Sequence, residues 1–264
     1  MNYMKRFLVL SLMLLVLVPY GQHLLAWGAK GHRIIAQVAY DNLNKKARKQ
    51  VDAVLGKHGM IYLASWADEI KSDTIYPNSH DWHYQDLDGG LTDSAVVAKL
   101  TDYPQEGGNM FRALDSLKNE LKYHKDNHDA LAFYVHLYAD RYCPMHVAHL
   151  DDKGGNAVKM KWFGQNTNLH SVWDAKIIDS KGFTYSEYAI YLQDRFGKMK
   201  KNVQKMTEHE TLLSTYHLTD DIYTYQTSWN GNAYHYSYFW IDEMEWQMYI
   251  SAIKLAQHLN QIYK

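Results

Sequence analysis

Residues 27–39 read WGAKGHRIIAQVA, and this stretch decides how the fold begins. Apolar residues recur in it at helical spacing, which predicts an amphipathic helix from His32 to about Leu55. A main-chain amine freed at Trp27 could bind a metal together with the Trp27 carbonyl and the His32 imidazole. The first residue of the folded chain is therefore a candidate metal ligand.

The residues before position 27 have the pattern of an export signal. A basic pair at positions 5 and 6 precedes an apolar run over residues 7–18, and the small residue Ala26 ends the segment. We therefore expect residues 1–26 to be a signal peptide that is removed on export to the periplasm or the cell exterior. An uncleaved anchor is the alternative, because Leu24 stands where a smaller residue is usual.

The composition of the remaining residues, 27–264, limits what they can bind. The chain of 264 residues has 28 basic and 29 acidic side chains, and removing Lys5 and Arg6 leaves 26 against 29, a formal charge of −3. A protein that holds nucleic acid by a basic surface would be more positive. A phosphate-bearing substrate must therefore be attracted locally, and bound metal cations are the simplest local source.

Residues 27–264 are expected to form a single domain, because they contain no repeat, linker or shift in composition. They have no apolar run that is long enough to span a membrane. The single Cys143 excludes an intrachain disulfide, and the absence of a glycosylation sequon favours a bacterial envelope or secreted protein. No stable protein partner is indicated, so a monomer is expected.

Helical patterns dominate, and the predicted fold class is mainly α-helical. Asn109 and Asp129 are candidate N-caps of two helices, the second of which should end before Pro144. The sequence TYSE at residues 184–187 has the form of a capping box, and it predicts a helix over residues 188–203.

Two further features place a core and a site on this helical scaffold. Residues 240–263 carry apolar side chains on one face and should pack in the core. Residues 72–103 and 151–169 are predicted loops. Long loops on a helical scaffold are where functional residues are usually found.

Histidine and aspartate recur at spacings that suit a metal site. His136 and Asp140 are four residues apart, as are His170 and Asp174, so each pair should project from one helix face. Imidazole and carboxylate ligands without thiolate are typical of catalytic zinc, and the central Asp140 is the natural bridge between two ions. The candidate ligands are Trp27, His32, Asp68, His83, His136, Asp140, His146, His170 and Asp174.

Six motifs carry a resemblance to a known family. They are WGxxGH at 27–32, ASWAD at 64–68, WHY at 82–84, HxxxDxxxPxH at 136–146, GGN at 154–156 and NLHxxWD at 168–174. In this order they resemble the motifs of the S1/P1 nuclease family. The resemblance implies a single helical domain similar to the phospholipase C/P1 nuclease fold, with long loops forming a cleft for three Zn²⁺ ions. It also implies hydrolysis of single-stranded DNA or RNA to 5′-phosphorylated nucleotides, with 3′-nucleotidase activity on nucleotides as a further reaction.

The resemblance also implies a role for each site residue. One ion would be held by Asp68, His83, His136 and Asp140, its close neighbour by the Trp27 amine and carbonyl, His32 and Asp140, and the third by His146, His170 and Asp174. Three further residues would act on the substrate: Asp86 would orient the attacking water between the close ions, Lys71 would stabilise the phosphoryl transition state, and Tyr84 would stack on a base.

Simpler interpretations of these residues stay open. From the sequence alone, Asp86 also fits a solvated loop carboxylate, Lys71 a surface lysine and Tyr84 a rim or core tyrosine.

Two other functions would use the same candidate metal ligands. A zinc-dependent phospholipase C shares the fold, although such enzymes typically have glutamate where this chain has Asp174. A periplasmic zinc-binding protein without catalysis would not need Asp86.

Overall fold

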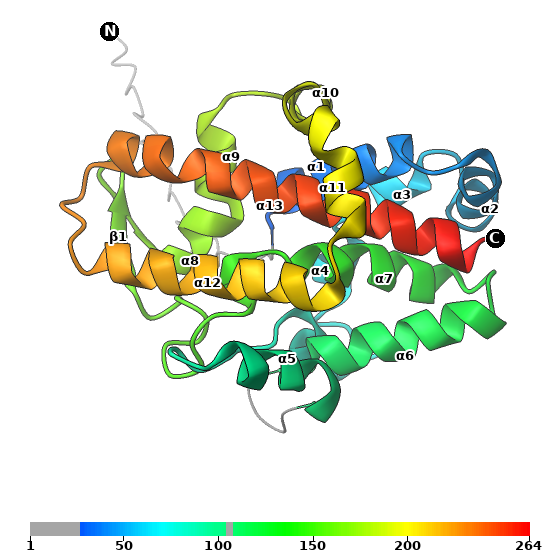
Figure 1. Cartoon of the computed structure of the whole chain (residues 1–264), viewed down its shortest axis with the longest axis horizontal. Coiled ribbons are helices and arrows are strands. Elements are labelled where there is room, and N and C mark those ends of the chain that lie inside the picture. The colour runs from blue at the N-terminus through cyan, green and yellow to red at the C-terminus, as the bar shows by residue number, and fades with distance from the viewer. Residues whose placement is uncertain (1–26, 104–107) are drawn as a thin grey trace, which may run out of the picture.

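The computed structural model describes residues 27–103 and 108–264, and they form a mainly α-helical architecture, as predicted (Figure 1). The predicted signal peptide lies outside the described residues. None of the helices in these two ranges is long and apolar enough to cross a bilayer. The α-helices are α1 Ala29–Asp41, α2 Lys45–Leu55, α3 Gly59–Tyr62, α4 Trp66–Ile70, α5 Asp93–Asp102, α6 Met110–Tyr123, α7 His128–Asp140, α8 Leu169–Ser171, α9 Ile177–Ser180, α10 Tyr185–Phe196, α11 Lys200–Lys205, α12 Glu208–Gln226 and α13 Ala233–Ile262.

The remaining elements are short and lie between these helices. Two strands pair antiparallel as a hairpin, with Lys159 opposite Asn168 and Trp162 opposite Gln165. A π-helical segment, η3, follows α8, and three 3₁₀ turns complete the order. The bounds are η1 Ser79–His83, η2 Pro144–His146, β1 Lys159–Trp162, β2 Gln165–Asn168, η3 Val172–Lys176 and η4 Gly197–Met199.

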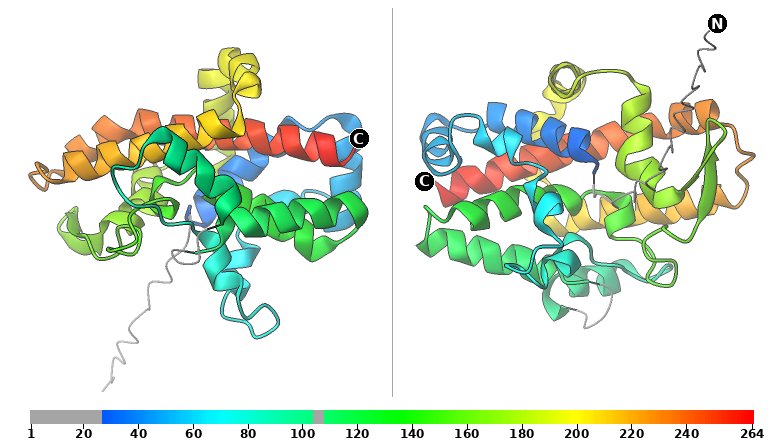
Figure 2. Two further views of the ribbon diagram at one scale, coloured as in Figure 1. Left: turned by 60° about the horizontal axis from the view of Figure 1, so that its bottom comes forward. Right: turned by 180° about the vertical axis from the view of Figure 1, so that it is seen from behind.

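The long helix α13 is the centre of the core. It packs against α1, α7, α10 and α11, and Figures 1 and 2 show it running along the longest axis of the molecule beside α12. Side chains such as Met244, Met248 and Leu255 are fully buried, which confirms the prediction that residues 240–263 pack in the core. Most of α13 from Met244 onward is buried, and the polar Glu245, Gln247 and Lys254 are buried there among apolar side chains.

The elements differ from the sequence predictions at several places, and the predicted loops over residues 72–103 and 151–169 contain α5 and the β1–β2 hairpin, respectively. The single helix expected from His32 to Leu55 is two helices, because the chain turns at residues 42–44 and the Asn44 side chain caps α2 by accepting from Ala47 N. The predicted cap Asp129 is wrong: Asn127 caps α7, and Asp129 accepts a hydrogen bond from Tyr76. Asn109 does precede α6, but its side chain makes no capping hydrogen bond.

The capping box at the start of α10 is confirmed, with Thr184 and Glu187 bonded reciprocally. The helix ends at Phe196, however, and the chain continues through η4 into α11 rather than as one helix to residue 203.

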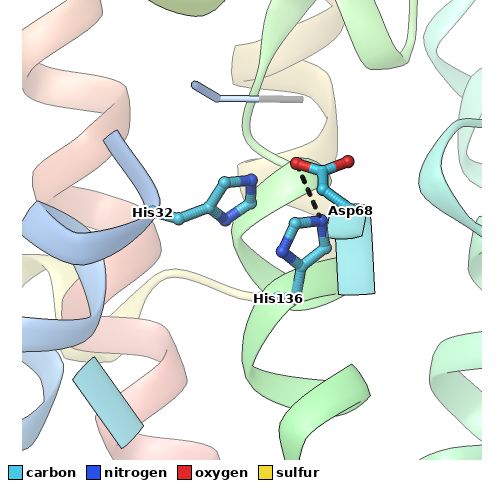
Figure 3. A group of neighbouring side chains, drawn as sticks. All are labelled: His32, Asp68 and His136. Carbon is cyan, nitrogen blue, oxygen red and sulfur yellow. Dashed lines mark ion pairs between the residues drawn. The ribbon is translucent and has the colours of Figure 1, made fainter. Parts of the chain in front are cut away.

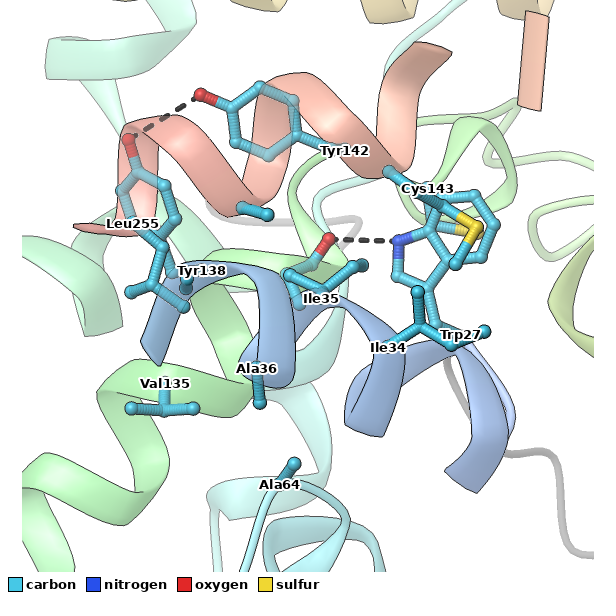
Figure 4. Close-up of a cluster of buried hydrophobic side chains, with 14 of the residues drawn as sticks. Trp27, Ile34, Ile35, Ala36, Ala64, Val135, Tyr138, Tyr142, Cys143 and Leu255 are labelled. Atoms are coloured by element: carbon cyan, nitrogen blue, oxygen red, sulfur yellow. Dashed lines mark hydrogen bonds between the residues drawn. The ribbon is translucent and has the colours of Figure 1, made fainter. Parts of the chain in front are cut away.

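Trp27 belongs to the apolar cluster between α1, α7 and α13 (Figure 4). Its side chain is fully buried, and the indole Nε1 donates a hydrogen bond of 2.9 Å to the carbonyl of Ala139. Burying the indole next to Ile34 and Cys143 holds the start of the domain against the end of α7. Ala139 precedes Asp140, so this packing places Trp27 beside the candidate ligands.

Candidate metal centre

Five of the predicted ligands converge from four elements around Asp140. His32 comes from α1, Asp68 from α4, His83 from η1, and His136 and Asp140 from α7; Figure 3 shows three of them pointing toward one another. His32 Nε2 lies 3.2 Å from Asp140 Oδ1, and His136 Nε2 lies 3.3 Å from Asp140 Oδ2. We call these five residues the Asp140 group.

The remaining contacts of this group are equally close. His83 Nδ1 lies 3.2 Å from Asp140 Oδ2 and 3.6 Å from Asp68 Oδ1. The rings of His32 and His136 stack with centroids 3.8 Å apart. Such crowding of carboxylates and imidazoles, all of them buried, is an arrangement that a bound cation stabilises.

The electrostatics of the Asp140 group favour a cation. Burial lowers the pKa of His136, but Asp140 and Asp68 outweigh it and raise that pKa to about 9. For His83 burial dominates and lowers the pKa to about 4. Burial also acts to raise the pKa of Asp140, yet the surrounding imidazoles hold it well below its usual range. Asp140 is therefore an ionised carboxylate in the protein interior, where a positive partner is required.

A second set of predicted ligands, His146, His170 and Asp174, lies beside the first and is called the Asp174 group. His170 Nε2 is 3.0 Å from Asp174 Oδ2, and His146 Nε2 is 3.8 Å from Asp174 Oδ1. The predicted spacing of four residues does bring His170 and Asp174 together. The backbone between them passes from α8 into the π-helical η3, a geometry that is frequent at functional sites.

Three histidines share one orientation. Nδ1 of His136, His146 and His170 donates to the main-chain carbonyls of Ala64, His83 and Gly154, respectively, at 2.5–2.7 Å. Each ring is thereby held with Nε2 toward a carboxylate. Metal-binding histidines are typically fixed in this way, by a hydrogen bond from the nitrogen that does not bind the ion.

Unsatisfied polar atoms provide a test of whether metal ions fit. Within the two ligand groups, the buried atoms without a hydrogen-bond partner are both ring nitrogens of His32, Asp68 Oδ2, His83 Nε2, Asp140 Oδ1 and His146 Nε2. His32 Nε2 is close to Asp140 Oδ1 but is not aligned for a hydrogen bond with it. Leaving one such atom unpaired costs about 1–3 kcal/mol. Six of them in one place are consistent with ligands that receive their partner when ions bind.

Three combinations of side-chain atoms lie within 4.8 Å of one another and could each hold an ion. They are His32, Asp68 and His136; His83, His136 and Asp140; and Cys143, His146 and Asp174. The first two combinations consist of members of the Asp140 group, and both include His136. The third contains Cys143 in place of His170.

The start of the domain is fixed between the two groups. Trp27 is tied to Ala139 through its indole, and Gly28 N donates a 2.7 Å hydrogen bond to the carbonyl of Asp174. A Cβ at Gly28 would lie 3.0 Å from the Cβ of Ala175, so the chain passes close to η3 here. The main chain of residues 27–28 is therefore held close to Ala139 and to Asp174.

A cleft of about 350 Å³ opens over both groups. Its lining includes the predicted substrate-contacting residues Lys71, Tyr84 and Asp86. Lys71 Nζ lies 3.4 Å from Asp68 Oδ1, and Tyr84, half-buried, donates its hydroxyl to Asp81 at 3.2 Å. The full lining is Asp68, Lys71, His80, His83, Tyr84, Asp86, Met145, His146, Leu150, Lys153, Gly154, Asn156 and His170.

Asp86 is buried and lines this cleft. Burial raises the pKa of Asp86 to about 7, and the nearby Asp152 adds to the shift while His170 opposes it. Gly154 leaves room beside it: a Cβ there would lie 3.4 Å from Asp86 Oδ1 and 2.5 Å from the Met145 carbonyl, and its φ of +61° suits glycine. Asp86 is thus not the solvated loop carboxylate of the simpler interpretation.

Residues 27–264 match the family model described as S1/P1 nuclease, a range that contains every candidate site residue. The chain belongs to the S1/P1 nuclease family. Among curated relatives, it is 28% identical to Endonuclease 2 of Arabidopsis thaliana over 67% of this chain and 64% of that protein. It is 28% identical to Nuclease S1 of Aspergillus oryzae over 69% of this chain and 64% of that protein. These alignments span less than two thirds of each relative's length.

This member of the S1/P1 nuclease family also matches Nuclease P1 of Penicillium citrinum, with 30% identity over 56% of the chain and 57% of that protein. The family match favours the nuclease interpretation over the other two considered from the sequence, which would use the same ligands.

Sequence reasoning missed two contributors to this S1/P1 nuclease site. The Cys143 thiol, considered only for disulfides, donates to Asp174 Oδ1 at 3.4 Å, and burial raises its pKa well above the usual value. A protonated thiol there orients the carboxylate. Lys153 lines the cleft from the loop before the GGN motif. The position of Cys143 midway between Asp140 and His146 was the available signal.

Proposed function

We propose that this protein is a zinc-dependent nuclease that hydrolyses single-stranded DNA and RNA to 5′-phosphorylated nucleotides, with 3′-nucleotidase activity as a further reaction of the same site. Two adjacent groups of buried imidazoles and carboxylates, with six unpartnered polar atoms beneath a cleft, carry the proposal. Family membership gives the reaction class. Nucleic acids and nucleotides are the proposed substrates.

Zinc is the proposed metal, because the donors are imidazoles and carboxylates. Three ions would be held, two by the Asp140 group with the main chain of Trp27 and one by the Asp174 group. Bound zinc would supply Lewis acidity and positive charge for phosphodiester hydrolysis. Hydrogen bonds from His136, His146 and His170 to carbonyl oxygens would hold these three donors in place.

Three residues at the cleft are proposed to act on the substrate. Asp86, with its pKa near neutrality, is suited to hydrogen-bond the attacking water and to accept its proton. Lys71, beside Asp68, would contact a phosphoryl oxygen. Tyr84 presents a half-buried ring at the cleft, where an unpaired base can stack. Stacking of this kind favours single strands.

We also propose that residues 1–26 are a signal peptide, that cleavage after Ala26 exposes the Trp27 amine as a ligand, and that the protein is exported as a monomer. The main chain at Gly28 is bonded to Asp174, which supports a ligand role for its neighbour. Before cleavage the nitrogen of Trp27 would be a peptide amide, which is a poorer metal ligand than the free amine that cleavage would expose. Export and activity are therefore coupled in this proposal.

The decisive experiment measures release of nucleotides from single-stranded DNA and RNA by two purified forms. One begins at Trp27 and the other carries a single alanine before Trp27. Zinc per chain and phosphatidylcholine hydrolysis are measured in parallel. We expect hydrolysis by the first form and a loss of at least tenfold in the second.

The other outcomes are equally informative. Equal hydrolysis by both forms would reject the N-terminal ligand and leave the nuclease proposal standing. A zinc-loaded protein that begins at Trp27 but cleaves neither DNA nor RNA would reject the nuclease proposal. Phosphatidylcholine cleavage would then indicate a phospholipase, and its absence a zinc-binding protein.

A further inference from the structure

The segment from the cleft through the β-hairpin differs in charge from the rest of the chain. Residues 153–173 contain Lys153, Lys159 and Lys161 and not one aspartate or glutamate, although the whole chain has slightly more acidic than basic residues. A local run of positive charge in a near-neutral protein creates a local attraction for anions.

The two strands display this charge on one face. The burial of β1 alternates, with Lys159 and Lys161 exposed and Met160 and Trp162 buried. Lys161 is paired with Asn166, and cross-strand partners point to the same face. The exposed face of the hairpin thus combines lysine ammonium groups with an asparagine amide, and its other face packs on the core.

This face adjoins the cleft at the base of the hairpin. Lys159 is paired with Asn168, whose side-chain amide donates to Asn156 Oδ1 at 3.4 Å, and Asn156 lines the cleft. The backbone closes the same junction, since His170 N donates to the carbonyl of Gly155 at 3.4 Å. A chain bound in the cleft could therefore continue onto the hairpin without crossing another element.

The ammonium groups on this path are available. Across residues 27–103 and 108–264, no ion pair is found for Lys153, Lys159 or Lys161, whereas other lysines are paired, as Lys30 is with Asp179 at 2.8 Å and Lys181 with Glu245 at 3.6 Å. A lysine that already has a carboxylate partner must give it up to bind a phosphate. Lys153, Lys159 and Lys161 have no such partner to give up among the described residues.

An aromatic ring lies at the far end of the path. Phe163, at the turn of the hairpin, is 47% exposed, and its ring meets Tyr234 edge-on with centroids 4.7 Å apart. Figure 1 shows the hairpin at the end of the molecule opposite the C-terminus, beside the start of α13. Lysine side chains that lead to an exposed aromatic ring are a combination typical of surfaces that bind single-stranded nucleic acid.

We propose that Lys153, Lys159, Lys161 and Phe163 form a hairpin strip that binds the phosphodiester backbone of a single strand beyond the nucleotides in the cleft. The strip would give long single strands an advantage over short ones. This inference rests on the proposed nuclease function, because the strip extends the substrate path of that site.

The test compares two substrate lengths. Lys159→Gln/Lys161→Gln is assayed on a dinucleotide and on a 20-nucleotide single strand over a range of salt concentrations. The matched control is Lys198→Gln/Lys201→Gln, which removes the same charge from exposed lysines elsewhere. For the long strand we expect KM to rise by about tenfold, and the salt slope of log(kcat/KM) to fall by about 1.4, at about 0.7 per phosphate contact.

The outcomes separate this inference from the function on which it rests. Equal KM and equal salt slope for the hairpin variant, the control and the unmodified protein would overturn the hairpin strip while leaving the nuclease function intact. A KM increase of the same size for both double variants would indicate a general charge effect and would also overturn it. An unmodified protein that cleaves neither substrate rejects the nuclease function first.

Discussion

Nδ1 of His146 donates a 2.5 Å hydrogen bond to the main-chain carbonyl of His83. His83 belongs to the Asp140 group and His146 to the Asp174 group, so this bond joins the two. The adjoining backbone continues the contact, since Gln85 N donates to the His146 carbonyl and Leu87 N to the Ala148 carbonyl, both at 2.8 Å. Asp86 lies inside this junction. A shift of either group would therefore also move the proposed water-orienting carboxylate.

Replacing Asp86 by asparagine should lower kcat by about 10²- to 10⁴-fold, the usual contribution of a general base. The amide keeps the shape of the side chain but cannot accept a proton. Zinc content should stay unchanged, because Asp86 belongs to neither group. Steady-state kinetics and metal analysis test this. Asp88→Asn, at an exposed position two residues away, is the control, and kcat within threefold of the unmodified value in Asp86→Asn would remove Asp86 from the mechanism.

Gly154→Ala should weaken the Asp174 group. Its new Cβ would meet the Met145 carbonyl at 2.5 Å and would displace the loop whose carbonyl holds His170. Gly182→Ala has a similar positive φ, +71°, but meets open space, so it measures backbone strain alone, about 1–2 kcal/mol. We expect a lower zinc content and at least tenfold less activity only in Gly154→Ala. Equal losses in both variants would show that the clash has no effect.

Tyr84→Leu should raise KM for single strands by about 5- to 150-fold, since one base–aromatic contact contributes about 1–3 kcal/mol. Tyr84→Phe keeps the ring and loses only the hydrogen bond to Asp81, so its KM should stay within about threefold. Kinetics on one oligonucleotide compare the two variants. If leucine and phenylalanine gave the same KM, stacking at this position would be refuted.

The partly buried Glu208 predicts a pH-dependent stability. Burial acts to raise its pKa, but Arg141 and His258 outweigh that effect and hold the pKa well below its usual range. A carboxylate with a depressed pKa stabilises the fold above its unfolded pKa of about 4.3, and this stability is lost as the pH falls toward the folded value. The stability difference between the unmodified protein and Glu208→Gln should therefore shrink below about pH 5.

Urea unfolding between pH 3 and pH 7, with a chelator in every sample, measures this difference. Chelation removes the competition between protons and metal from the comparison. Glu243→Gln, at an exposed position, is the control and should leave the pH dependence unchanged. A stability difference between the unmodified protein and Glu208→Gln that is constant with pH would show that Glu208 is not stabilised as an anion.

Local sequence patterns predicted which helices form better than they predicted the residues at which those helices begin and end. The capping box at Thr184 needs only residues within one helical turn, and it is present as predicted. The sequence does not predict the break of the first helix at residues 42–44, because the helical spacing of apolar residues continues across the position of the Asn44 cap. Asp129 was mistaken for a cap because its true partner, Tyr76, lies 53 residues away.

The sequence by itself determined the helical class, the donor types and the spacing that pairs His170 with Asp174, because these depend on composition and on residues within one helical turn. The family resemblance implied that Asp68, His83 and His32 gather with Asp140, but only the tertiary structure decided their contacts, the hydrogen bond from the Cys143 thiol to Asp174 and the link from the hairpin to the cleft through Asn168 and Asn156. Those contacts join residues far apart in the chain. They depend on how α1 and α4 pack against α7, which no local pattern contains.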